Sequence, residues 1–143
     1  MVDNLTAVVL VGGQGMRLRP LTADLPKPMI PVVNRPFLEH LLVRLKSHGV
    51  ERVILASGYR PDVIEEHFGG GLDLGLEIFY AVEDSPLGTS GAVKAAANDI
   101  SSTFLVLNGD VVMHLDVTKF LEWHKATSAS ATIALYRVDD PSR

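Results

Sequence analysis

Continuous apolar segments alternate with helical patterns along the chain, and this alternation constrains the fold more than any other feature. Segments typical of buried strands cover residues 5–11, 52–56, 76–81, 103–107 and 132–138. Most of them are apolar throughout rather than at every second residue, as in strands that are covered on both faces. Strands of this kind predict a parallel sheet.

Four segments with helical periodicity follow the strand-like segments, at residues 37–48, 61–68, 89–98 and 117–125. Pro61 suits the first position of a helix, and Asp116 suits an N-cap. Repeated β–α units with right-handed crossovers predict a Rossmann-like, doubly wound α/β fold. The sheet should be mostly parallel, with helices on both faces in three layers.

Composition limits the partners of such a domain. The chain has 143 residues, 47% of them hydrophobic, which is enough for one domain with a sizeable core. A net charge of −4 argues against nucleic acid or an anionic membrane as the main partner. The chain has no cysteine, which excludes disulfides and thiolate chemistry. The sequence carries no apolar segment of membrane-spanning length, and we expect a cytoplasmic location.

A doubly wound sheet binds ligands beyond the carboxyl ends of its strands. Three loops leave predicted strands there: the glycine-rich loop from Gly12, the segment from Glu83 to Pro86, and Asn108-Gly109-Asp110. The sequence therefore predicts that these three loops meet at one edge of the sheet.

The first loop has the residues of an anion site. Gly12, Gly13 and Gly15 remove side chains that would keep a phosphate from backbone N–H groups. Positive charge comes from Arg17, Arg19 and Lys27, and Pro26 and Pro28 restrict the backbone around Lys27. The alternative is an ordinary glycine-rich βα turn with solvated basic side chains.

Two common phosphate motifs do not fit this loop. A P-loop would need Gly-Lys followed by Ser or Thr, and a dinucleotide fingerprint would need glycine at position 18, which is leucine. Pro20 also prevents a long helix from starting directly after the turn.

Four segments in order resemble the sugar-phosphate nucleotidyltransferases, most closely the mannose-1-phosphate guanylyltransferase branch. They are "LVGGQGMRLRPLT", "PKPMIPVVNRPFLEHLL", "EDSPLGTSGAVK" and "LNGDV". The family's loop usually reads Gly-x-Gly-Thr-Arg-Leu, and Met16 replaces the threonine here. The resemblance implies transfer of a nucleotidyl group from an NTP, expected to be GTP, to a sugar 1-phosphate, with release of pyrophosphate and with Mg²⁺ as cofactor. The expected acceptor is mannose 1-phosphate, which gives GDP-mannose, and the alternative is a close relative that gives a GDP-heptose.

The resemblance also assigns roles to individual residues. Arg17 would hold the β- and γ-phosphates, and Lys27 would lie between the α-phosphate and the sugar phosphate, so these two are the predicted catalytic residues. The predicted nucleotide-binding residues are Leu10, Gly12, Gly13, Gly15, Arg17, Glu83 and Gly88. The acceptor is a phosphate oxygen that is already ionised near neutral pH, so the chemistry needs no general base.

Asp110 is the candidate ligand for Mg²⁺, because a carboxylate after the fourth predicted strand could share a metal ion with nucleotide phosphates. The alternative is a hairpin, since Asn108-Gly109 between apolar segments is a strong turn signal. Asp116 and the histidines fit structural roles better than ligand roles.

Glu83 is the candidate for base selection, since the resemblance places this position against the nucleobase. A carboxylate offers two acceptors to the N1–H and N2–H₂ donors of guanine, whereas thymine and uracil offer one such donor. The alternative is an acidic residue that only stabilises a turn.

Family members continue for roughly as many residues again, so residues 1–143 correspond to the nucleotide-binding part of a nucleotidyltransferase domain. The sugar-binding part and a second metal-binding aspartate would lie outside this chain. We therefore expect nucleotide binding with poor turnover, and self-association into homo-oligomers through an uncovered sheet edge. The alternatives are an inactive or regulatory truncated homologue that only binds nucleotide, and a uridylyl or thymidylyl transferase of the same family.

Overall fold

The computed structural model describes residues 5–13, 15–112 and 114–140. The contacts within it divide the chain into two compact units, Met1–Met113 and His114–Arg143.

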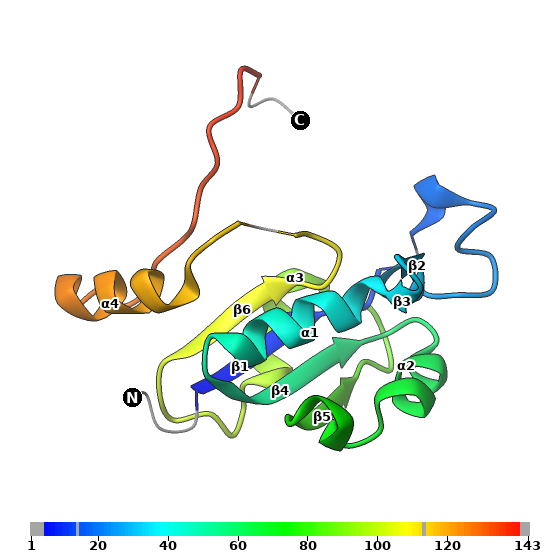
Figure 1. Cartoon of the computed structure of the whole chain (residues 1–143), viewed down its shortest axis with the longest axis horizontal. Coiled ribbons are helices and arrows are strands. Elements are labelled where there is room, and N and C mark those ends of the chain that lie inside the picture. Colours follow the sequence, from blue (N-terminus) through cyan, green and yellow to red (C-terminus); the bar gives the residue numbers. More distant parts are fainter. Residues whose placement is uncertain (1–4, 14, 113, 141–143) are drawn as a thin grey trace. The chain divides into compact units, whose positions relative to one another are not determined.

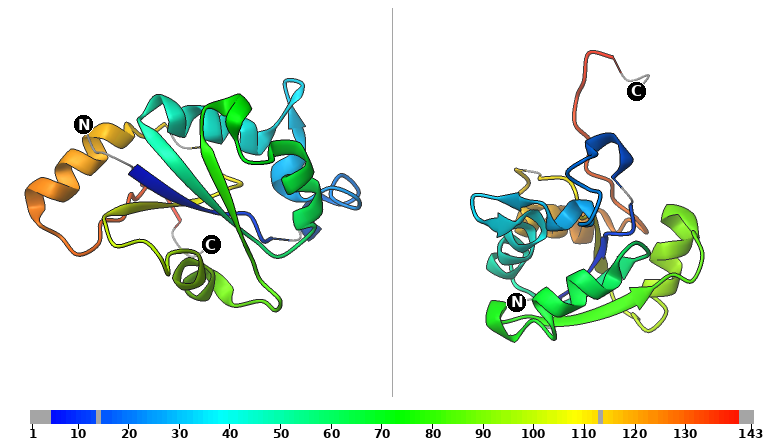
Figure 2. Two further views of the ribbon diagram at one scale, coloured as in Figure 1. Left: turned by 90° about the horizontal axis from the view of Figure 1, so that it is seen from below. Right: turned by 90° about the vertical axis from the view of Figure 1, so that its right-hand side faces the viewer.

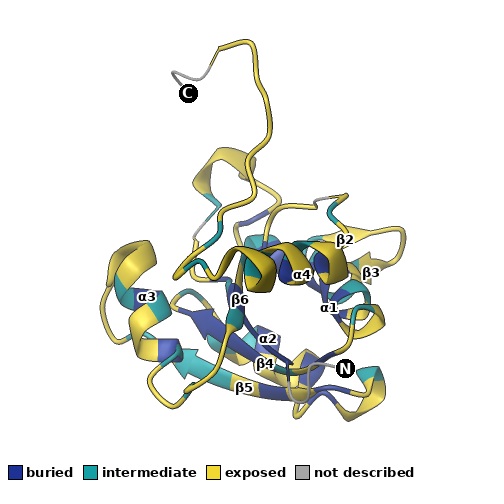
Figure 3. Ribbon diagram, turned by 90° about the vertical axis from the view of Figure 1, so that its left-hand side faces the viewer, coloured by how far each residue is buried: buried dark blue, intermediate teal, exposed yellow. Residues whose placement is uncertain are grey.

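The first unit contains a parallel sheet of four strands, as the apolar segments predict. The strands are β1 (Leu5–Leu10), β4 (Val50–Ser57), β5 (Glu77–Val82) and β6 (Phe104–Asn108), and their order in the sheet is β5-β4-β1-β6. β1 pairs in parallel with β4 on one side and with β6 on the other, so Leu10 lies opposite both Ala56 and Asn108. The central position of β1 explains why its side chains are buried from Leu5 to Val9 (Figure 3).

Helices cover both faces of this sheet (Figures 1 and 2). α1 (Phe37–Ser47) and α2 (Pro61–Phe68) lie on one face, and α3 (Gly88–Ala96) lies on the other. α1 buries four leucines against the sheet, at positions 38, 41, 42 and 45. On the opposite face, Ala92 and Ala96 of α3 pack with Val8, Ile54 and Ala56 of the central strands. The predicted doubly wound, three-layer α/β fold is therefore confirmed in this unit.

A small hairpin between β1 and α1 was not predicted. It consists of β2 (Pro31–Val32) paired antiparallel with β3 (Arg35–Pro36). Val33 and Asn34 form the turn with positive φ angles of 50° and 63°, as a tight two-residue hairpin turn requires. The described residues also form three short 3₁₀ helices, η1 (Met16–Leu18), η2 (Lys27–Met29) and η3 (Leu72–Leu74). η1 and η2 carry two of the predicted site residues.

The second unit contains α4 (Val117–Thr127) and the segment that follows it. Asp116 is the N-cap of α4, as predicted, and its carboxylate accepts a hydrogen bond from the Lys119 backbone N–H at 3.1 Å. The strand predicted at 132–138 is wrong, because this segment forms no strand in the structure. Its apolar side chains are exposed, by 78% at Ile133, 89% at Leu135 and 90% at Tyr136. A strand needs a hydrogen-bonded neighbour, and no described strand pairs with this segment.

The described part of the chain has no helix that is both long and apolar enough to span a bilayer.

Candidate functional site

The strand order creates a topological switch point at the end of β1. The chain runs from β1 outward through β4 to β5 and then crosses to β6, on the other side of β1. The loops after β1 and β6 therefore leave neighbouring strands and diverge at the carboxyl edge of the sheet. Ligands of open α/β sheets bind in the crevice at such a point. The glycine-rich loop starts at this point, and Asp110 lies in the loop that starts beside it, as predicted.

Gly109 brings the end of β6 close to the end of β1. Its backbone N–H donates to the Leu10 carbonyl at 2.8 Å. A Cβ atom added at Gly109 would lie 2.6 Å from Cγ1 of Val11 and 2.9 Å from the Leu10 oxygen. Only glycine fits this close approach, and the approach sets where the next residue, Asp110, leaves the sheet.

Gly109→Ala should lower the free energy of unfolding by about 1 to 3 kcal/mol, the usual range for overpacking, because the backbone of Leu10 cannot move without disturbing the sheet. Thermal and urea unfolding followed by circular dichroism would measure the loss. Gly70→Ala is the matched control, since an added methyl group there meets no atom within 4 Å. Equal stability of the two variants would contradict the close approach.

The segment around Lys27 is anchored by its two prolines. Pro26 and Pro28 are buried, whereas Lys27 between them is only half-buried. Lys27 begins η2, whose turn is closed by hydrogen bonds from Met29 N–H to the Pro26 carbonyl and from Ile30 N–H to the Lys27 carbonyl. The burial of the two prolines and these hydrogen bonds hold the backbone that carries the ammonium group.

Lys27 and Asp110, 83 residues apart in sequence, form an ion pair across the switch point. Nζ of Lys27 donates to Oδ2 of Asp110 at 2.7 Å, and the two side chains are 35% and 40% exposed. The alternative in which Asp110 lies in a hairpin ladder is wrong, since β6 ends at Asn108 and residues 109–112 form no strand. The structure thus brings a cation and a carboxylate from two loops into contact at the accessible edge of the sheet.

Arg17 lies in η1, two residues after Gly15, whose φ angle of 60° starts that turn. Its side chain is exposed, and it forms no ion pair with another described residue. Arg19 ends the same turn and is also exposed. The guanidinium of Arg17 is therefore available to an anion that enters the loop, and no contact in the structure joins it to Lys27 directly.

Glu83 follows β5 at the same edge of the sheet. Its backbone N–H donates to the Ser57 carbonyl at 2.9 Å, and a Cβ added at Gly58 would lie 3.9 Å from both the Glu83 Cβ and the Gly12 oxygen. The loops that carry Gly12, Gly58 and Glu83 thus lie side by side along the edge. Oε2 of Glu83 accepts a hydrogen bond from the Leu87 N–H at 3.1 Å. Glu83 therefore stabilises the turn before α3, and its second oxygen has no hydrogen-bond partner among the described residues.

The other predicted nucleotide-binding residues frame this edge. Leu10 ends β1 and is half-buried, and Gly12 and Gly13 follow it as exposed backbone. Gly88 begins α3 with a φ angle of 68°, and no atom lies within 4 Å of where its Cβ would be. The structure brings Gly15, Lys27 and Asp110 together as one group, and Gly12 and Glu83 as a second group connected through Gly58.

The donor set fits a metal ion that is shared with a ligand. No group of three or more histidine or acidic side chains able to hold a metal ion occurs among the described residues. Mg²⁺ is commonly held by one or two carboxylates together with substrate phosphates. Asp110 offers such a carboxylate at the accessible edge, where it already contacts the ammonium group of Lys27.

Sequence reasoning missed the residues that hold the glycine-rich loop in place. Thr22 is buried, and its hydroxyl donates to the Gly15 carbonyl at 2.8 Å. From the loop after β4, Tyr59 and Arg60 donate to the Ala23 and Asp24 carbonyls, both at 3.4 Å. The contacts of Tyr59 and Arg60 join two loops, and that of Thr22 spans seven residues within one loop, so no local pattern indicates them.

Arg60 is itself fixed by a carboxylate at the start of α2. Its Nε and one terminal nitrogen donate to Asp62 at distances from 2.9 to 3.1 Å. These hydrogen bonds raise the pKa of Arg60 and lower the pKa of Asp62. The guanidinium is therefore held in place while it also contacts the glycine-rich loop.

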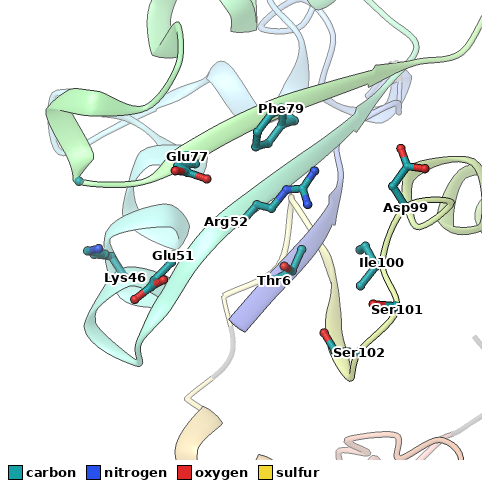
Figure 4. Close-up of a pocket in the computed structure, with 11 residues that line it drawn as sticks. Thr6, Lys46, Glu51, Arg52, Glu77, Phe79, Asp99, Ile100, Ser101 and Ser102 are labelled. Carbon is teal, nitrogen blue, oxygen red and sulfur yellow. The ribbon is translucent and has the colours of Figure 1, made fainter. Parts of the chain in front are cut away.

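A separate hollow of about 710 Å³ lies toward the amino ends of the strands (Figure 4). Residues from the starts of β1, β4 and β5 line it, together with Asp99 to Ser102 before β6. Arg52 lies over the ring of Phe79, 4.4 Å from its centroid. The predicted site residues are absent from this lining, so the hollow is distinct from the switch-point site.

A sheet of this order, with a glycine-rich loop and a charged pair at its switch point, defines the class of doubly wound α/β proteins that bind ligands at the carboxyl edge. Comparisons with known proteins give the family. The family model described as nucleotidyl transferase matches residues 6–143, nearly the whole chain. The chain therefore belongs to the nucleotidyl transferase family, as the resemblance indicated.

Similar proteins include two guanylyltransferases. The chain is 48% identical over 136 residues to mannose-1-phosphate guanylyltransferase of Mycobacterium tuberculosis, covering 94% of this chain and 38% of that protein. It is 40% identical over 132 residues to D-glycero-alpha-D-manno-heptose 1-phosphate guanylyltransferase of Aneurinibacillus thermoaerophilus, covering 92% and 57%. This chain thus spans about two fifths to three fifths of the length of these relatives.

A solved structure has the same fold. HddC from Yersinia pseudotuberculosis, crystallised in complex with GMP-PN, superposes with a TM-score of 0.76 and 37% sequence identity. The match covers 84% of this chain and 54% of HddC.

Proposed function

We propose that the switch-point site binds a nucleoside triphosphate and serves guanylyl transfer to a sugar 1-phosphate. The observation that carries this proposal is the contact between Lys27 and Asp110 at 2.7 Å. It places one group suited to phosphate and one suited to a metal ion side by side, on loops that leave adjacent strands. Arg17 and the glycines on the same loop supply further contacts for an extended anion.

In this reaction the main contributions of the protein are to neutralise phosphate charge and to align the two substrates. An ionised oxygen of the sugar phosphate attacks the α-phosphorus, a new P–O bond forms, and the bond to the bridging oxygen of the leaving pyrophosphate breaks. In this proposal Arg17 holds the β- and γ-phosphates, and Lys27 orients the α-phosphate toward the sugar phosphate. Mg²⁺, when bound at Asp110, would neutralise phosphate charge. Positioning and electrostatic stabilisation account for most of the acceleration in reactions of this type.

The relatives support guanine as the base and a manno-configured sugar. The two relatives named above are guanylyltransferases, one for mannose 1-phosphate and the other for a manno-heptose 1-phosphate. We propose GTP as the nucleotide and one of these two sugar phosphates as the acceptor. A cytoplasmic location and the formation of homo-oligomers remain predictions from the sequence.

A second candidate function is nucleotide binding without turnover by residues 1–143. The length comparison favours it, since the chain covers 38% of the mycobacterial relative. Calorimetric titration with GTP and Mg²⁺, beside a pyrophosphate-release assay with mannose 1-phosphate, separates the two candidates. GTP binding with product formation supports transfer, GTP binding alone supports the second candidate, and absence of GTP binding contradicts both.

Base selection can be tested at Glu83. GTP should bind more tightly than UTP or dTTP, and Glu83→Gln should reduce this preference several-fold, since a bidentate contact to a base contributes about 1 to 3 kcal/mol of discrimination. The glutamine carbonyl can still accept the hydrogen bond from Leu87, so the turn should persist. Calorimetric affinities for the three nucleotides provide the measurement.

Asp84→Asn is the matched control for Glu83→Gln, because it makes the same change of charge one residue away. It should leave the preference for GTP unchanged. A preference of the unaltered chain for UTP or dTTP would contradict guanine as the base while leaving the family unaffected.

A further inference from the structure

Thr22 has an unusual environment within the glycine-rich loop. Thr22 is only 1% exposed, whereas all the remaining residues from 16 to 25 are exposed. A buried polar side chain needs a hydrogen-bond partner, because otherwise the free-energy cost of its desolvation is not offset. Its hydroxyl does so by donating to the Gly15 carbonyl at 2.8 Å.

The Gly15 carbonyl connects two parts of the loop. It also accepts the hydrogen bond from the Leu18 N–H at 2.9 Å, which closes the turn that carries Arg17. The Thr22 hydroxyl therefore holds the same oxygen that defines the position of η1.

Lys27 lies against the same glycine. A Cβ atom added at Gly15 would lie 3.0 Å from both Cγ2 of Thr22 and Cβ of Lys27. The backbone of Gly15 has a φ angle of 60°, which disfavours other residues as well. Gly15 is thus packed between Thr22 and Lys27, and the hydroxyl of Thr22 locks this packing.

We propose that Thr22 is a positioning residue that fixes the turn bearing Arg17 relative to Lys27. Arg17 and Lys27 lie on two short 3₁₀ turns, separated by a segment in which only Thr22 and Pro26 are buried. The contacts around Gly15 connect the turn that bears Arg17 to Lys27, and Tyr59 and Arg60 hold the loop farther along, at Ala23 and Asp24. This inference rests on the proposed function, in which both cations bind one triphosphate.

Thr22→Val tests the inference, because valine keeps the shape and removes the hydroxyl. We expect GTP affinity to fall by about 3- to 10-fold, the range that corresponds to one neutral hydrogen bond. Thr22→Ser, which keeps the hydroxyl, should bind GTP within about twofold of the unaltered chain. Thr103→Val makes the same chemical change at an exposed position outside the loop, and should have no effect on affinity.

A double-mutant cycle with Arg17 distinguishes positioning from general stabilisation. If Thr22 acts by placing Arg17, Thr22→Val should change GTP affinity by less than about twofold in an Arg17→Ala background. The same loss in both backgrounds would overturn the inference, as would a Thr22→Val chain that binds GTP normally or does not fold. Absence of GTP binding by the unaltered chain would instead refute the proposed function, and with it the basis of this role.

Discussion

Replacing Arg17 by alanine is expected to weaken GTP binding by roughly 10- to 150-fold, since charge-assisted hydrogen bonds to phosphate are worth about 1.5 to 3 kcal/mol. Arg17 is exposed and forms no ion pair with another described residue. Arg17 therefore loses no ion pair with a described residue when a phosphate binds, and most of the interaction contributes to affinity. Calorimetric titration at fixed salt and Mg²⁺ concentrations measures the loss.

Arg19→Ala is the control that separates a specific contact from the general charge of the loop. Arg19 is exposed at the end of the same turn, so its removal changes the local potential in the same direction. We expect a loss of no more than about threefold, because screened charges without a direct contact contribute little. Equal losses for the two variants, or no loss for Arg17→Ala, would contradict the role of Arg17.

Strands and helices whose pattern reflects burial could be predicted from the sequence. Val8 and Val9 lie in a continuous apolar segment because β1 is covered on both faces, and the segment forms a strand as predicted. The prediction for α2, residues 61–68, matches the structure at both ends, since Pro61 starts the helix and the glycines after Phe68 end it. In these cases the local sequence is sufficient to predict the strand or helix.

The strand predicted at 132–138 shows where local chemistry is insufficient. Ile133, Leu135 and Val138 favour an extended backbone, but a strand also needs a neighbouring ladder, and no described strand supplies one. The hairpin of β2 and β3 is the opposite case, an element that is present in the structure but was not predicted. Val33 disfavours the positive φ angle that the turn requires, so the sequence does not indicate a turn that the fold imposes.

The candidate site, too, could be predicted only in part from the sequence. Strand order places the loops that carry Lys27 and Asp110 at one edge, so their proximity could be expected once the doubly wound fold was predicted. Their direct ion pair depends on how the preceding residues pack against other parts of the chain, through the burial of Pro26 and the close approach of Gly109 to β1. Thr22 could not be found, because a threonine in a proline-rich loop has no pattern that indicates burial.

The Lys27–Asp110 ion pair joins the two groups that substrates would have to separate. In the proposed function Lys27 contacts phosphate and Asp110 contacts Mg²⁺, whereas in this structure each is the partner of the other at 2.7 Å. Binding of nucleotide and metal together would replace one charge-assisted contact by two. Binding of nucleotide alone would leave the carboxylate close to phosphate, which is unfavourable.

Asp110→Asn should therefore have opposite effects with and without Mg²⁺. The amide is nearly isosteric but lacks the charge that attracts a metal ion, so the enhancement of GTP binding by Mg²⁺ should fall to less than about twofold. Without metal, GTP should bind up to about fivefold more tightly than to the unaltered chain, because an exposed ion pair worth up to about 1 kcal/mol no longer holds Lys27. Titrations with GTP in EDTA and in Mg²⁺ measure both effects, and persistence of the metal enhancement would contradict the role of Asp110.

Lys27→Met completes this experiment. If Asp110 weakens metal-free binding by holding Lys27, the gain from Asp110→Asn should disappear in the Lys27→Met background, whereas simple repulsion between the carboxylate and phosphate would leave it intact. The fold should survive in all variants, since both side chains are more than a third exposed, at 35% and 40%, and the pair contributes little to stability. A metal-free gain of the same size in both backgrounds would show that Asp110 acts on the phosphates directly and that the ion pair plays no part in binding.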